Sequence, residues 1–224
     1  MKALQLLIKS LIGTLFFLLI LFLSAGRLNY WQGWVFASIC IISTLLNSLT
    51  LLKRDELAEE RSTVKAGTKS WDKKITAISA VLLILLYAVA GLDSGRFLWT
   101  GNFPPAIYAL GAILIVTGEV VFLTAQHQNK FFSSVMRIQA DRGHTVCDTG
   151  IYRIVRHPAY FGMIVTSLGI PLLLGSLWSY IPSAFSILLI LIRTSLEDNT
   201  LIRELEGYRE YTVKTPYRIF PGIW

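Results

Sequence analysis

Six apolar runs of near membrane-spanning length constrain this chain more than any other feature of its sequence. They lie at about residues 6–24, 33–52, 74–91, 104–125, 159–175 and 180–194. An α-helix rises about 1.5 Å per residue, so the longer runs can cross the ~30 Å hydrocarbon core of a bilayer. With 54% hydrophobic and 16% charged residues, the chain is too apolar for a soluble domain. The sequence therefore predicts an all-α, polytopic integral membrane protein with about six transmembrane helices.

The last two runs are short and predict a helical hairpin. Gly175 and Pro182 bracket the polar turn between them. The polar residues that follow, 195–224, predict a cytoplasmic tail helix that ends or is interrupted near Gly207.

Lysine and arginine residues gather on one set of segments. Of the 21, two precede the first run, seven lie in loop 53–74, five in loop 126–157 and five from Arg193 onward. The other connections hold only Arg27 and Arg96. Cytoplasmic segments retain positive charge, so this division of nineteen to two predicts that both termini are cytoplasmic. Acids are interspersed among these cations, so we expect anionic lipids, and not nucleic acid, to account for the net charge of +7.

Two further features of the sequence bear on processing and metal binding. The first apolar run resembles a secretory signal, but we expect it to remain as a span. Cys40 lies inside a span and Cys147 in a cytoplasmic loop, and neither has neighbours with metal-ligand spacing. We therefore expect no disulfide and no metal site.

The segment IYRIVRHPAYFG, residues 151–162, marks the start of the fifth apolar run. Proline suits the first helical turn and disfavours helix in the residue before it, so His157 should end the loop and Pro158 should begin the helix. Unpaired N–H groups at a helix start favour anions, and Arg156 adds a full charge beside them. Gly162 removes a side chain where a bound molecule could approach the backbone.

The same segment has a simpler interpretation. Arginines at a membrane border anchor helices, and Tyr152 and Tyr160 could belong to an interfacial aromatic belt. Taken singly, each residue favours that interpretation, so the functional one depends on the joint pattern.

Acidic residues in two other places belong near the same border. Glu197 follows Arg193 at helical spacing i, i+4, so the two should share a face, as a ligand-binding pair or as an ordinary surface pair. Glu119 lies about 9 Å inside the fourth span, where an acid either snorkels to water or faces protein. These clusters converge on one side of the membrane and suggest a cytoplasm-facing pocket that opens to the bilayer, for a water-soluble cofactor and a lipidic substrate.

Two long stretches together match a known family. GHTVCDTGIYRIVRHPAYFG (143–162) and RTSLEDNTLIRELEGYREYTVKTPYRIFPGIW (193–224) resemble the isoprenylcysteine carboxyl methyltransferases, in particular their bacterial relatives. LLKRDELAEERS (51–62) also looks like the prokaryotic members. The resemblance implies an N-terminal transmembrane hairpin with its loop (1–73), a methyltransferase core (74–224), and a location in the bacterial inner membrane.

The resemblance implies S-adenosylmethionine as methyl donor and a lipophilic carboxylate, such as a prenylcysteine, as acceptor. The residues that it implies around the donor are His144, Tyr152, His157, Pro158, Tyr160, Gly162 and Glu197. Arg156 and Arg193 would hold the acceptor carboxylate, and Glu197 would close the site from the tail. The family often has paired glutamates where this chain has Glu197 and Asp198, which leaves the role of Asp198 open.

Three alternatives remain beside this interpretation. A phospholipid N-methyltransferase would use the same donor, but two arginines would repel a protonated amine acceptor. An NADPH-dependent membrane reductase would need room for two more phosphates and a nicotinamide. A non-enzymatic membrane protein on the same scaffold would leave the donor site without a use.

Overall fold

The computed structural model describes residues 2–52, 54–62 and 66–224 and is helical, with no strand in these ranges. The α-helices are α1 (Lys2–Ala25), α2 (Trp31–Leu52), α3 (Asp55–Ser62), α4 (Ser70–Ala90), α5 (Pro105–Gln128), α6 (Pro158–Leu174), α7 (Tyr180–Glu204) and α8 (Tyr208–Lys214). A π-helix, Gly91–Phe97, extends α4. Two short 3₁₀ turns, Ala140–Arg142 and Gly150–Arg153, lie in the loop between α5 and α6.

Among the described residues, five helices are long and apolar enough to cross a membrane: α1, α2, α4 with its π-helical extension, α5 and α7. The remaining apolar helix, α6, has 17 residues and is about 25 Å long. The predicted polytopic helical fold and its C-terminal hairpin, formed by α6 and α7, are therefore confirmed, with one arm shorter than a full span.

Helix α7 is longer than the apolar run that predicted it. It continues without interruption past residue 194 to Glu204, because the residues there include the good helix formers Leu, Glu and Arg. Gly207 then adopts a left-handed conformation, φ +78°, and α8 begins at the next residue. The acids of the tail thus project from a rigid extension of a membrane helix.

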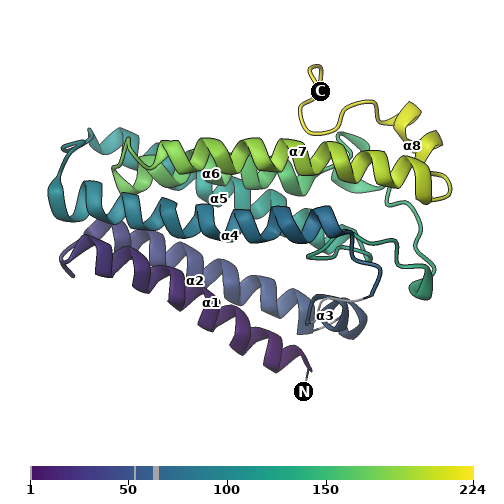
Figure 1. The fold of residues 1–224 in the computed structure, drawn as a ribbon, viewed down its shortest axis with the longest axis horizontal. Helices are drawn as coiled ribbons and strands as arrows, with labels where there is room; N and C mark the ends of the chain where they lie inside the picture. Colours follow the sequence, from purple (N-terminus) through teal and green to yellow (C-terminus); the bar gives the residue numbers. More distant parts are fainter. Residues whose placement is uncertain (1, 53, 63–65) are drawn as a thin grey trace.

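The apolar helices lie side by side along the long axis of the molecule (Figure 1). Both termini, α3, α8 and the connection between α5 and α6 lie at one end, and short turns join the helices at the other (Figure 1). The polar segments that are far apart in sequence therefore meet at one end of the bundle, which is the arrangement that the charge distribution predicted.

Helices α5 and α6 pack closely because each has glycines at the contact. A Cβ atom at Gly162 would lie 2.5 Å from the carbonyl oxygen of Gly118, and one at Gly111 would lie 2.3 Å from the backbone nitrogen of Leu173. Gly162 was predicted to leave room for a bound molecule. Helix α5 fills that room instead, so the close packing of Gly162 fixes where α6 starts.

Glu119 faces protein and not the membrane border. The Ser43 hydroxyl of α2 donates a hydrogen bond to its carboxylate. Both residues line a second cavity of about 230 Å³, together with Cys40 and Tyr87. Of the two interpretations of this acid, the structure supports the one in which it faces protein and a cavity between helices.

Candidate active site

Helix α6 begins at Pro158, with His157 as its N-terminal cap residue, as the sequence predicted. The chain just before it is paired with the C-terminal tail. The backbone N–H groups of Arg156 and His157 donate to the carbonyl oxygens of Tyr217 and Arg218 at 2.9 and 2.8 Å. The tail therefore returns across the start of α6 and closes this end of the molecule.

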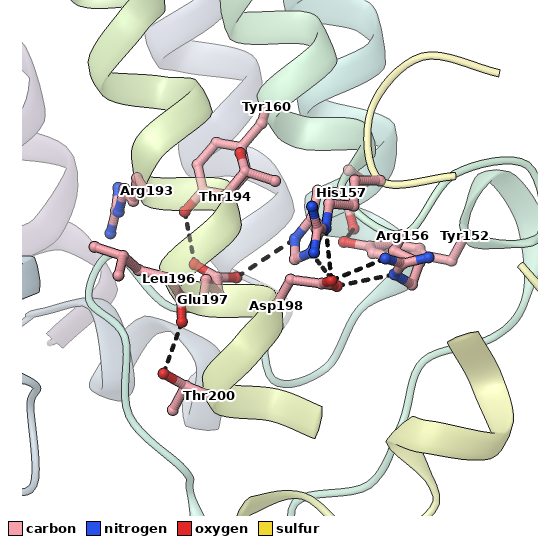
Figure 2. A network of polar contacts seen from close by, with 12 residues as sticks. Tyr152, Arg156, His157, Tyr160, Arg193, Thr194, Leu196, Glu197, Asp198 and Thr200 are labelled. Carbon is pink, nitrogen blue, oxygen red and sulfur yellow. Dashed lines mark hydrogen bonds and ion pairs between the residues drawn. The ribbon is translucent and has the colours of Figure 1, made fainter. Parts of the chain in front are cut away.

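Asp198 is the centre of the network that joins these segments (Figure 2). Its carboxylate is fully buried. It accepts hydrogen bonds from Nε and Nη2 of Arg156, both at 2.8 Å, and from Nε of Arg218 at 2.8 Å. The Tyr208 hydroxyl donates at 2.9 Å, and Nε2 of His157 lies 3.1 Å away. One acid on α7 thus holds α6, α8 and the tail together.

Arg156 binds other residues of this network, which leaves it little capacity to bind a substrate. Beyond its two bonds to Asp198, its Nη1 donates to the carbonyl oxygens of Thr215 and Pro216 at 2.8 and 2.7 Å. Burial lowers the pKa of Arg156, but the hydrogen bonds and charge of Asp198 outweigh burial and raise that pKa above its ordinary value. Four of its five N–H donors are engaged, which argues against the predicted role of Arg156 in holding an acceptor carboxylate.

Glu197 lies beside Asp198 but points toward a different set of partners (Figure 2). The Tyr160 hydroxyl donates to its Oε2 at 2.7 Å, and Nδ1 of His157 lies 3.8 Å from its Oε1. Its side chain remains 22% exposed. Glu197 therefore keeps acceptor capacity for a further group, in contrast to Asp198.

Arg193 is oriented by a partner from the front half of the chain. Its Nε and Nη2 donate to the two oxygens of Asp72 at 2.7 and 3.2 Å, and Nη2 also donates to the carbonyl oxygen of Ser134 at 3.1 Å. Its guanidinium lies over the ring of Tyr160, 5.6 Å from the centroid. In the described part of the chain Nη1 has no such bond, so this nitrogen can still donate.

His144 and Tyr152 come from the loop between α5 and α6. Nδ1 of His144 accepts the backbone N–H of Gln139 at 3.3 Å, so its proton is assigned to Nε2. Burial, and then the charges of Arg137 and Arg142, lower the pKa of His144 to about 4. The ring is therefore neutral at pH 7. The buried Tyr152 hydroxyl donates to the carbonyl oxygen of Ala125 at 3.2 Å, and burial raises its pKa.

These side chains share one cavity of about 300 Å³ at the polar end of the bundle. That volume is at the lower end of the range for small-molecule sites, ~300–1,000 Å³. Eight of the nine residues predicted for the site line it: His144, Tyr152, Arg156, His157, Pro158, Tyr160, Arg193 and Glu197. The ninth, Gly162, lies between helices as described above. Aromatic side chains complete the wall: Phe131, Phe132, Tyr208 and Tyr211.

The sequence did not predict which acids hold Arg193 and Arg156. Asp72 stands in the first turn of α4, where an acid is ordinary, and its partner Arg193 lies 121 residues further on. Asp198 was noticed, but its role stayed open. In the sequence, their acidic side chains were the only signal. The structure buries both completely, and a buried charge is rarely found without a partner.

The elements and the cavity define a helical membrane protein with a ligand-sized polar site at one end. Residues 106–206, from α5 to the end of α7, match the family model described as phospholipid methyltransferase. Proteins named protein-S-isoprenylcysteine O-methyltransferase are also similar to parts of this chain, so both comparisons support a likeness to phospholipid and isoprenylcysteine methyltransferases. The resemblance predicted from the motifs is thereby confirmed.

Three relatives show how far the similarity extends. Protein-S-isoprenylcysteine O-methyltransferase A of Arabidopsis thaliana is 30% identical over 80 residues, which are 34% of this chain and 36% of the plant protein. The Schizosaccharomyces pombe enzyme of that name is 29% identical over 121 residues, 51% of this chain and 50% of the yeast protein. The Saccharomyces cerevisiae enzyme is 32% identical over 66 residues, 29% and 28% of the two chains. The matches thus span at most half the length of these relatives. All three organisms are eukaryotes, so the bacterial origin of this chain stays a prediction.

Proposed function

We propose that this protein transfers a methyl group from S-adenosylmethionine to the carboxylate of a lipophilic acceptor of the isoprenylcysteine type. The observation that carries the proposal is the shared cavity: it brings together the residues that the family resemblance implied, on the family-matched segment, at one end of a membrane bundle. Apolar helices beside the cavity suit an acceptor that arrives from the bilayer.

The lining residues fit a cationic, nucleoside-containing donor. Glu197 offers carboxylate oxygens to a ribose hydroxyl, an amine or the sulfonium charge. The neutral ring of His144 and the faces of Tyr152 and Tyr208 suit an adenine ring and its edge. These residues would hold the donor, which supplies an activated methyl group when bound.

The acceptor needs positioning more than activation. A carboxylate is already ionised at pH 7 and is itself the nucleophile, so no general base is required. Arg193, held by Asp72 and stacked on Tyr160, would turn its remaining Nη1 donor toward that carboxylate. Orientation and exclusion of water are then the main contributions of the protein. A neutral ester product would lose the attraction to Arg193, which favours its release.

A phospholipid N-methyltransferase is the second candidate, because the family model carries that description. The remaining Nη1 donor of Arg193 disfavours it, since a protonated amine is itself a hydrogen-bond donor and offers that group no acceptor. The two candidates share the donor and differ in the acceptor.

The sidedness that we propose is a cytoplasmic site with both termini on the same side of the membrane. It rests on the nineteen-to-two division of lysine and arginine and on the location of both termini at the polar end of the bundle. Reporter fusions at the two termini of the bacterially expressed protein should both report the cytoplasm. Reporters that read opposite sides would overturn this topology.

Donor binding is the first test of the proposal. Purified protein in nanodiscs, titrated by calorimetry, should bind S-adenosylmethionine and S-adenosylhomocysteine saturably in the ~1 μM–1 mM range usual for enzyme substrates. NADPH should give no saturable heat. Binding of NADPH alone would favour the reductase alternative, and binding of neither would favour a non-enzymatic membrane protein.

A further inference from the structure

Helix α3, from the front half of the chain, is attached to the polar end of the bundle by a buried ion pair. Glu60 on α3 accepts from Nε and Nη2 of Arg137 at 2.8 and 2.6 Å, and their side chains are 1% and 6% exposed. Asp141 accepts from the same guanidinium at 2.8 Å. Breaking a buried pair is costly, so this contact fixes α3 against the loop between α5 and α6.

The residue after Glu60 extends this attachment to the cavity. Arg61 lines the cavity, with its guanidinium carbon 5.4 Å from the centroid of the Phe132 ring. Its Nη1 is buried and has no hydrogen-bond partner in the described residues. Burial lowers the pKa of Arg61 to about 10, so the group is still charged at pH 7. A charged donor left unpaired in this way is costly unless another group supplies the acceptor.

Arg61 differs in this respect from the other arginines of the cavity. Arg137, Arg156 and Arg193 also line it, and each is held in a two-point contact with a carboxylate of the protein. In the described part of the chain, no carboxylate forms an ion pair with the Arg61 guanidinium. Because such a fork matches a carboxylate or a phosphate, Arg61 is the cavity arginine with most capacity left for an anionic ligand.

We propose that Arg61 is a second contact for the acceptor carboxylate and thereby helps to select acids over neutral and cationic acceptors. The proposal rests on the proposed function and adds a specificity-determining residue from α3, which lies outside the matched segment 106–206. Arg193 and Arg61 would each offer Nη1, and the donor side of the cavity would remain with Glu197 and His144.

The test compares Arg61→Gln and Arg61→Lys with Arg209→Gln, which removes the same charge from an exposed position on α8. Arg61→Gln should raise the KM for S-farnesylcysteine about 10- to 100-fold, the range for losing a hydrogen bond to a charged group. The affinity for S-adenosylhomocysteine should stay unchanged. Arg61→Lys should restore part of the loss, and Arg209→Gln should match the wild-type protein.

A binding measurement keeps this inference separate from the proposed function. Wild-type protein should bind S-farnesylcysteine more tightly than its amide, which lacks the carboxylate charge, and Arg61→Gln should lose most of that preference, whether or not methyl transfer occurs. An unchanged preference in Arg61→Gln overturns the role of Arg61. An equal loss of affinity for S-adenosylhomocysteine also overturns it, because Arg61 would then contact the methyl donor. Absence of methyl transfer by the wild-type protein contradicts the proposed function alone. If Arg61→Gln does not fold, Arg61→Lys is compared instead. Its preference for S-farnesylcysteine over the amide should be weaker than that of the wild-type protein, and an unchanged preference overturns the role.

Discussion

Replacing Asp198 with Ala is expected to destabilise the protein by about 3–5 kcal/mol, the usual cost of breaking a buried ion pair. The change would leave Arg156, which is 7% exposed, without its carboxylate, and would also remove the partner of Arg218 and Tyr208. Thermal unfolding in detergent should show the loss. The tail from residue 208 onward should become sensitive to protease at the same time, because Asp198 holds it against α6 and α7.

Glu210→Ala is the matched control for this change, since Glu210 is an exposed acid on α8. It should alter the unfolding temperature little, as surface substitutions usually do. If Asp198→Ala is no more destabilising than Glu210→Ala, the network around Asp198 does not hold this end of the protein together.

Arg193→Ala should lower methyl transfer by about 10²-fold or more while leaving donor affinity nearly intact, because a misplaced acceptor loses the orientation advantage. Lys at this position should restore activity only in part, since an ammonium cannot reproduce the two-point contact with Asp72. Arg203→Ala, at an exposed position on the same helix, is the control and should behave as wild type. Steady-state kinetics and calorimetry on the same preparations separate the two effects.

Glu197→Ala provides the opposite result in the same experiment. It should weaken binding of the methyl donor by about 1–3 kcal/mol, the cost of leaving a buried hydrogen-bonding group of that molecule unpaired. If Arg193→Ala abolishes donor binding and Glu197→Ala does not, the two roles are reversed. If neither variant changes either quantity, the extension of α7 is not part of the site.

The membrane fold was readable from the sequence because the bilayer imposes a length on each apolar run. The start of α6 was readable too, since a proline fixes the residue before it, and Gly207 marked the start of α8. The helical tail beyond the last apolar run was also predicted, to near Gly207, and α7 continues to Glu204. The extension beyond residue 194 matters for function, since it carries Glu197 and Asp198.

The cluster of site residues was predicted better than their partners. An arginine fork binds an internal carboxylate and a ligand carboxylate in the same way, so the motif could not tell whether Arg156 holds a substrate or Asp198. Partner choice depends on packing between segments far apart in sequence, as for Arg193 and Asp72. The same holds for Gly162, whose neighbour is a helix that local sequence does not reveal.

Methyl transfer to defined acceptors decides whether this protein is a carboxyl methyltransferase. Purified protein should be incubated with S-adenosylmethionine carrying a labelled methyl group, and with S-farnesylcysteine, its methyl ester or phosphatidylethanolamine. We expect label only in the reaction with the free acid, in a product from which base hydrolysis releases labelled methanol, because the new bond is a carboxyl ester. Base-stable label in phosphatidylethanolamine, with none in the acid, would contradict it and identify an amine methyltransferase.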